Sequence, residues 1–261
     1  MRLLTDDLLR RIMPASQSDR RARFLAGLND AMREFEITTP QREACFLAQV
    51  CAESGSLTYD REIWGPTAAQ RGYEGRRDLG NTQPGDGFRF RGIGLIQVTG
   101  RANTTRAGVA LGLDLANHPD LGATPGNAPR LAAWFFATHG CLPYADKGDI
   151  LAVSRIVNVG HAKTTVMPNG WTTRRDCYAC ALPLLQAVPE DTAVPTTPTC
   201  TVKFSNGQTL TAEIDATNHA RCYAQEFLDK AGVGHPLVTE LATLIGSDTK
   251  WDAATRTLSV N

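Results

Sequence analysis

The chain has 261 residues, of which 42% are hydrophobic and 21% are charged, and its formal net charge is zero. This composition is typical of a globular protein, and the length allows one sizeable core and a smaller second unit. The neutral balance excludes the strongly basic surface of a dedicated nucleic-acid binder, and no apolar run approaches the length of a membrane span. We therefore expect neither nucleic acid nor membrane as a partner.

The N-terminal part of the chain predicts three helices. Thr5 is suited to cap a first short helix, and residues 19–35 place apolar side chains at helical spacing. The third helix has the clearest start, with Thr39 as candidate N-cap and Pro40 at its first position. It should end near Gly55, because glycine adopts the left-handed conformation that closes helices.

The next segment, residues 56–92, is rich in Gly, Arg, Asp and Pro and shows little periodicity, which predicts loops or short strands. Such a long irregular segment in a compact domain is usually functional. Helical patterns resume after Gly100 and continue to Leu185. We expect residues 1–187 to form one mainly α-helical domain around this insertion.

The C-terminal part changes character. Residues 188–199 are rich in Pro and Thr and read as an extended linker. Alternating apolar residues around Asn206-Gly207 then predict a β-hairpin. Two short helices near 219–231 and 236–245, and a final turn and strand, complete a small α+β domain over 200–261.

Seven cysteines leave at least one without an intrachain partner. Cys177 and Cys180 form a C-x-x-C pair in a helical pattern, but no second ligand pair accompanies it, so we expect no metal. We therefore predict free or buried thiols, as in a reducing compartment. Intermolecular disulfides are the alternative.

Two glutamates, Glu53 and Glu62, stand nine positions apart at the end of the third helix and in the loop beyond it. Nine residues of continuous helix span about 13 Å, too far for a glycosidase pair. A helix break at Gly55 would let the chain turn back, which allows an inverting acid–base pair about 6.5–9.5 Å apart. The spacing alone equally fits two unrelated charges at a helix end and in a loop.

The stretch RGIGLIQVTGRAN, residues 91–103, adds Gln97 and Thr99 inside an apolar run. In a strand-like conformation these two side chains would face the same way. Such a face suits sugar binding and the positioning of a water molecule. The alternative is an ordinary edge strand with a polar face.

Several segments together resemble the lysozyme-like family 19 glycoside hydrolases, and most closely their phage endolysin and chitinase-like lysin branch. The resemblance spans about residues 15–187 and rests on FLAQVCAESGS, FRFRGIGLIQVTGRAN, VSRIVNVG and NGWTTRRDCY, in that order. It implies a bilobal fold with a small irregular β/loop lobe. It also implies an inverting hydrolase of β-1,4-linked N-acetylhexosamine polymers that needs no metal or other cofactor.

The resemblance implies a role for individual residues. Glu53 matches the general acid, Glu62 the carboxylate that activates water, and Thr99 the hydroxyl residue that holds this water. Matches to substrate-contacting or cleft-supporting positions are Gln97, Asn103, Asn158 and Arg174. Three positions depart from the family pattern: Ala52 replaces His or Gln, Ile93 replaces a cleft arginine and Thr104 replaces an aromatic residue.

Residues 200–261 resemble, more weakly, the small domain named for the N-terminus of copper amine oxidases. This resemblance implies no copper and a module that attaches to the cell wall or to another protein.

Three functions fit the whole chain. The first is a phage endolysin that cleaves peptidoglycan, made in the host cytoplasm without a signal peptide, since Asp6 and Asp7 interrupt the only early apolar stretch. The second is a chitinase. The third is a virion tail-associated lysin that docks to other phage proteins through residues 200–261.

Overall fold

The computed structural model describes residues 3–189 and, beyond them, the strand segments 199–204, 209–214, 220–221, 249–252 and 257–260. The chain divides into two compact units, Met1–Thr192 and Ala193–Asn261. This division falls within the predicted 188–199 linker, most of which lies outside the described residues. Each unit is considered by itself below.

The first three helices lie where the sequence predicts them, and the predicted N-caps Thr5 and Thr39 precede the first and the third. They are α1 (Asp6–Ile12), α2 (Ser18–Glu34) and α3 (Pro40–Glu53). The hydroxyl of Thr5 accepts from the backbone N–H of Leu8, and that of Thr39 accepts from Arg42, each at 3.2 Å. These bonds satisfy backbone donors that a helix start would otherwise leave unpaired.

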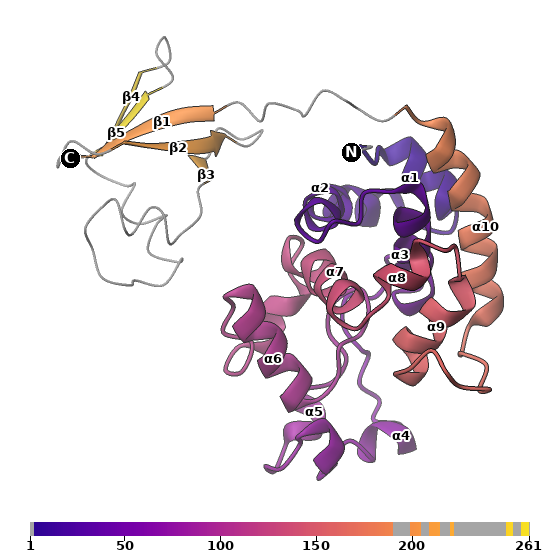
Figure 1. The fold of residues 1–261 in the computed structure, drawn as a ribbon. Coiled ribbons are helices and arrows are strands. Elements are labelled where there is room, and N and C mark those ends of the chain that lie inside the picture. The colour runs from indigo at the N-terminus through magenta and orange to yellow at the C-terminus, as the bar shows by residue number, and fades with distance from the viewer. Residues whose placement is uncertain are drawn as a thin grey trace. The chain divides into compact units, whose positions relative to one another are not determined.

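The predicted irregular insertion forms short helical turns rather than strands. It contains α4 (Ala68–Arg71), the 3-10 helix η1 (Arg77–Leu79) and α5 (Asp86–Arg89). Among the described residues of this unit, strand pairing is limited to two isolated bridges, Arg61 with Ile93 and Ile93 with Val98. Figure 1 shows α4 and α5 together at one end of the unit, away from α1 and α10.

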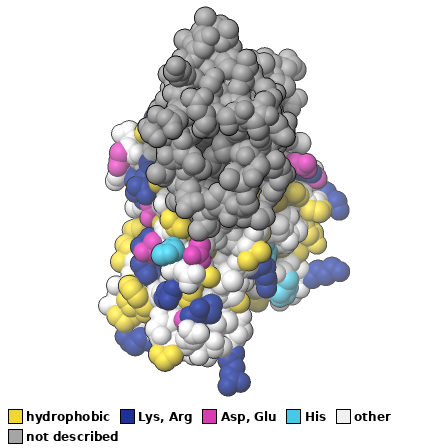
Figure 2. Space-filling model, turned by 90° about the vertical axis from the view of Figure 1, so that its left-hand side faces the viewer, with side chains coloured by type: hydrophobic (Ala, Val, Ile, Leu, Met, Phe, Trp, Pro, Cys, Tyr) yellow, Lys and Arg dark blue, Asp and Glu magenta, His cyan; other side chains and the backbone are white. Residues whose placement is uncertain are grey.

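The later helices follow the predicted order. They are α6 (Arg101–Leu111), η2 (Pro119–Ala123), α7 (Asn127–Thr138), α8 (Leu142–Ala145), α9 (Ile150–Val159) and α10 (Trp171–Ala187). Within the described part of the chain, no helix is both long and apolar enough to cross a bilayer. Figure 2 shows basic and acidic side chains interspersed on the visible described surface.

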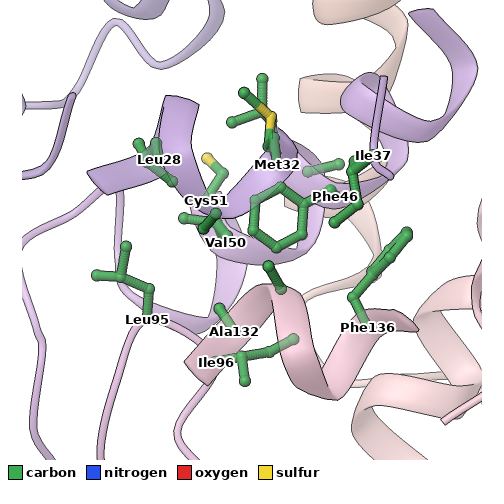
Figure 3. Packing of buried hydrophobic residues seen from close by; sticks show 14 of the residues in the cluster. Leu28, Met32, Ile37, Phe46, Val50, Cys51, Leu95, Ile96, Ala132 and Phe136 are labelled. Carbon is green, nitrogen blue, oxygen red and sulfur yellow. The ribbon is translucent and has the colours of Figure 1, made fainter. Parts of the chain in front are cut away.

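The core is built around α3. Every residue of this helix from Glu43 to Cys51 is buried, so this part of the helix is enclosed on all sides rather than along one face. Phe46 meets Phe136 of α7 edge to face, with ring centroids 5.5 Å apart (Figure 3). α10 packs along α3 more extensively than any other helix does. The last residue of this fixed central helix is Glu53.

The second unit contains a five-stranded sheet in the order β3-β2-β1-β5-β4. Its strands are β1 (Thr199–Phe204), β2 (Thr209–Ile214), β3 (Ala220–Arg221), β4 (Thr249–Asp252) and β5 (Thr257–Val260). β1 and β2 pair antiparallel with Val202 opposite Leu210, as the hairpin prediction requires. β1 also pairs parallel with β5. The start of the helix predicted near 219–231 is wrong, because Ala220 and Arg221 form β3 and pair with β2. The rest of that helix and the one predicted near 236–245 lie outside the described residues.

Candidate functional site

The chain reverses directly after Glu53, at the predicted break. Ser54 ends α3, and Gly55, Ser56 and Leu57 all have positive φ, at 56°, 56° and 69°. The hydroxyl of Ser54 accepts from the N–H of Leu57 at 2.8 Å, and Leu57 is fully buried. Positive φ is unfavourable for Ser and Leu, and such strain persists only where the surroundings impose it. This turn directs residues 58–62 back past the end of α3.

Glu53 is held by an arginine from the neighbouring helix. Arg174 Nη2 lies 2.5 Å from Glu53 Oε1, and Arg174 Nη1 donates to Gln49 Oε1, also at 2.5 Å. The Arg174 side chain is only 3% exposed, and that of Glu53 is 17% exposed. Because Gln49 and Glu53 are one turn apart on α3, the planar guanidinium of Arg174 fixes both side chains together.

Asn158 supports this arrangement from α9. Its Oδ1 accepts from the backbone N–H of Asn169 at 2.8 Å, and the carbonyl of Asn169 accepts from Arg174 Nε at 3.0 Å. Asn158 therefore anchors the loop that orients Arg174. Both predicted cleft-supporting residues thus help to position Glu53, Arg174 directly and Asn158 through the loop that orients Arg174.

Glu62 accepts hydrogen bonds from neutral donors. Its Oε1 accepts from Gln70 Nε2 at 2.9 Å and from the Tyr73 hydroxyl at 3.4 Å, and its Oε2 accepts from the Gly92 N–H at 3.0 Å. Burial raises the pKa of Tyr73, and the adjacent carboxylate of Glu62 adds to this effect. Tyr73 therefore stays a neutral donor. Gln70 is held in turn by a capping box with Thr67 at the start of α4.

The segment with Gln97 and Thr99 is a tight turn, so the strand-like interpretation is wrong. Ile93 and Val98 exchange backbone hydrogen bonds, at 3.1 and 2.9 Å, and Gln97 has φ of 57° between them. The two polar side chains therefore do not share one face of a strand. Gln97 Nε2 donates to the Gly94 carbonyl, and the Thr99 hydroxyl donates to the Gln97 carbonyl, at 2.9 and 3.0 Å.

Asn103 belongs to the same local network. Its Nδ2 donates to the Thr99 carbonyl at 2.9 Å, which ties the first turn of α6 to the end of the tight turn. In this structure Thr99 and Asn103 therefore stabilise the loop that carries Gln97. Both side chains are partly exposed.

The two glutamates line one hollow. It has a volume of about 250 Å³, and its lining is Glu53, Tyr59, Arg61, Glu62, Ile63 and Gln97. Of the predicted site residues, Glu53, Glu62 and Gln97 contribute to this lining. Tyr59, Arg61 and Ile63 were not predicted, although their place on either side of Glu62 was a usable signal. Gln70 was also missed, although Thr-x-x-Gln is a recognisable helix start.

The chemistry that these residues can perform is acid–base chemistry. No cluster of His, Cys, Asp and Glu in the described residues could hold a metal ion.

Within the same residues the cysteines form no disulfide, with Cys45, Cys51, Cys141 and Cys177 buried and Cys180 exposed. Cys200 and Cys222 are not among the side chains described.

The sequence is similar to known proteins over part of its length, and no family model matches it. The acidic 27 kDa endochitinase of Solanum lycopersicum is 42% identical over 113 residues, which are 42% of this chain and 39% of that protein. A glycosyl hydrolase family 19 domain-containing protein of Haemophilus influenzae is 32% identical over 92 residues, 35% of this chain and 44% of the other. The chain therefore spans less than half the length of the curated relatives it matches.

Solved structures match over a larger share of the chain. Chitinase C of Streptomyces griseus has a TM-score of 0.55 at 20% identity, covering 72% of this chain and 79% of its own. The class IV family 19 chitinase of Zea mays has a TM-score of 0.53 at 21% identity, covering 72% and 95%. The predominantly helical first unit thus has the predicted lysozyme-like fold of the family 19 chitinases, and the partial sequence matches are to the same family.

Proposed function

We propose that the first unit is a glycoside hydrolase that cleaves β-1,4 bonds between N-acetylhexosamines by an inverting mechanism. The observation that carries this proposal is the pair of carboxylates, Glu53 and Glu62, that line one hollow. Glycosidases of this kind need one carboxylic acid and one carboxylate on opposite sides of the scissile bond. The partial likeness to an endochitinase and to a family 19 domain supports the same activity.

Glu53 is the proposed general acid. In its protonated form it donates its proton to the oxygen of the leaving sugar, and as the bond breaks it becomes the carboxylate that pairs with Arg174. Arg174, 2.5 Å from its Oε1, stabilises the negative charge that this transfer creates. Gln49 and Asn158 keep Arg174 in place, so their contribution is positional.

Glu62 is the proposed general base. Its three hydrogen-bond donors are neutral, and each carboxylate oxygen has more than one acceptor direction, so Glu62 can still accept from a water molecule. This water would attack the anomeric carbon from the face opposite the leaving group. Thr99 is proposed to hold the water and Gln97 to contact the sugar. Asn103 acts through the loop that carries both.

Peptidoglycan is the substrate that we propose first, with the protein acting as a phage endolysin on the wall after its release from the host cytoplasm. The cationic Arg61 in the lining favours a glycan that carries carboxylates. Chitin is the second candidate, favoured by the 42% identity to a protein named an endochitinase.

The second unit is proposed to attach the enzyme to the wall or, in a tail-associated lysin, to other phage proteins. The support is the resemblance of residues 200–261 to the domain named for the N-terminus of copper amine oxidases. A chain that ends at residue 192 should then retain hydrolysis but sediment less with insoluble peptidoglycan. Equal sedimentation of the two chains would contradict this attachment role.

The test of the activity compares Glu53→Gln and Glu62→Gln with Glu36→Gln, an exposed glutamate outside the hollow. Mass spectrometry of digested peptidoglycan and of N-acetylglucosamine oligomers reports both the bond cleaved and the preferred substrate. Each site variant should lose at least about 100-fold in turnover, the usual contribution of a positioned acid or base. The Glu36 variant should match the wild type. A wild-type rate in either site variant, with unchanged circular dichroism, would overturn the assignment.

A further inference from the structure

Arg61 is a cation in the lining of the hollow that the proposed acid–base chemistry does not use. It lies between Asp60 and Glu62, and its backbone pairs with Ile93. Its Nη1 contacts Asp120 Oδ1 at 3.0 Å, with the Arg61 side chain 30% exposed and that of Asp120 67% exposed. An ion pair this open to water is weak and exchanges readily with another anion.

A second guanidinium belongs to Arg91, two residues before Ile93, the backbone partner of Arg61. Arg91 stacks on Phe88, 4.3 Å from the ring centroid, and its Nη1 donates to the Phe88 carbonyl at 2.9 Å. Burial lowers the pKa of Arg91, and the charge of Arg61 lowers it further, while Asp120 and Glu62 act in the opposite direction. In the described residues, Nε of Arg61 and Nε of Arg91 are buried without an acceptor. The charge of Arg61 thus acts on Arg91, and each of the two side chains keeps one buried N–H without an acceptor.

Positive charge is also in excess next to them. Asp60 is shared by Arg20 and Arg23, whose Nη2 atoms lie 3.2 and 3.3 Å from its Oδ2. Four guanidinium groups, those of Arg20, Arg23, Arg61 and Arg91, therefore stand against three carboxylates, Asp60, Asp120 and Glu62, which leaves one positive charge in excess. Glu53 does not reduce the excess, because Arg174 already pairs with it. An anionic group entering beside Arg61 would lower the electrostatic energy of the empty site.

We propose that Arg61, with the charge of Arg91 near it, binds a carboxylate carried by the sugar in the hollow and so selects acidic over neutral glycans. N-acetylglucosamine polymers offer no charge to this group. N-acetylmuramic acid carries a lactyl carboxylate, and a guanidinium binds a carboxylate through parallel N–H donors. The inference rests on the proposed function for the identity of the glycan, and it makes Arg61 the residue that distinguishes peptidoglycan from chitin.

Binding of a matched ligand pair tests the inference with the full-length protein. The ligands are the disaccharide of N-acetylglucosamine and N-acetylmuramic acid and the methyl ester of its carboxylate, compared by isothermal titration calorimetry. The wild type should bind the free acid about five- to tenfold more tightly, as expected of one partly exposed charge-assisted hydrogen bond. Added salt should reduce this preference.

Single substitutions identify the residues that cause the preference for the free acid over its methyl ester. Arg61→Gln should bind acid and ester alike, and Arg61→Lys should retain part of the difference. Asp120→Asn should enlarge the difference, because it removes the competing anion. Arg77→Gln, which changes an exposed arginine of η1 outside the lining, should behave as the wild type. Equal binding of acid and ester by the wild type, or an undiminished preference in a folded Arg61→Gln, would overturn the inference.

The test of this inference and the test of the proposed activity can fail independently of each other. If hydrolysis is independent of Glu53 and Glu62 but the acid is preferred through Arg61, the activity assignment fails and the inference stands. If both glutamates are required but acid and ester bind alike, the inference fails alone. In hydrolysis assays Arg61→Gln should raise KM for peptidoglycan strands while KM for N-acetylglucosamine oligomers stays unchanged.

Discussion

Replacing Arg174 with methionine should destabilise the protein strongly, because this residue connects α10 to the acidic end of α3. The guanidinium donates to Glu53 Oε1, Gln49 Oε1 and the Asn169 carbonyl. Methionine retains most of the side-chain volume but supplies no donor, so a carboxylate and a fully buried amide oxygen lose their partner.

The size of the effect follows from the burial of the pair. Removing one partner of a buried ion pair costs about 3–5 kcal/mol. The 17% exposure of the Glu53 side chain lets water stabilise part of the remaining charge, so about 3 kcal/mol is expected. For a unit of this size that corresponds to a fall in Tm of about 6–12 °C.

The adjacent residue provides the control. Arg175 pairs with Asp176 at 2.8 Å, but their side chains are 55% and 58% exposed. Arg175→Met should therefore change Tm by no more than about 2 °C. Thermal unfolding followed by near-ultraviolet circular dichroism compares the two variants. Equal shifts, or a shift below about 2 °C for Arg174→Met, would show that the buried ion pair does not stabilise the protein as expected.

The double variant Glu53→Gln/Arg174→Met isolates the effect of the unpaired negative charge of Glu53 on stability. If the unpaired carboxylate causes much of the loss, the double variant should regain at least about 1 kcal/mol over Arg174→Met alone. A double variant less stable than the sum of both single changes would contradict this cause.

Two further predictions concern acid stability and thiol chemistry. The hydrogen bond from Arg101 is the main cause that lowers the pKa of Asp86, so the stability that Asp86 contributes is present above the ordinary carboxyl pKa of 3.8 and is lost as the pH falls further. Asp86→Asn should therefore be less stable than the wild type at pH 7. In acid denaturation curves the stability of this variant should fall less below pH 3.8. Iodoacetamide should label Cys180 in the native protein well before Cys45 and Cys141, whose thiol pKa values burial raises to about 12, as peptide mass spectrometry would show; labelling at equal rates would contradict their burial.

Local signals in the sequence were sufficient for most of the helices of the first unit. Thr39 and Pro40 specify the start of α3, and Gly55 its end, because capping and left-handed conformations depend on residues in immediate succession. The same rule predicted the reversal that brings Glu62 into the hollow with Glu53. The pairing of β1 with β2 was likewise specified by the turn residues between them.

Other features depend on contacts between distant residues. Arg174 and Glu53 are 121 positions apart, so no spacing rule indicates that they form an ion pair. The turn at Gln97 was missed because alternating residues indicate a strand, whereas the bridge between Ile93 and Val98 closes a loop. Sequence reasoning did not select Arg61, which the fold places in the lining of the hollow.

The proposed cleavage of a β-linked glycan by Glu53 and Glu62 inverts the anomeric carbon, and this inversion can be observed directly. Proton NMR of soluble peptidoglycan glycan strands, recorded during the first minutes of digestion, reports the anomer at each new reducing end before mutarotation. Inversion should release the α-anomer first, and neither Glu53→Gln nor Glu62→Gln should release it at a comparable rate. Initial release of the β-anomer, or undiminished release by either variant, would contradict the proposed mechanism.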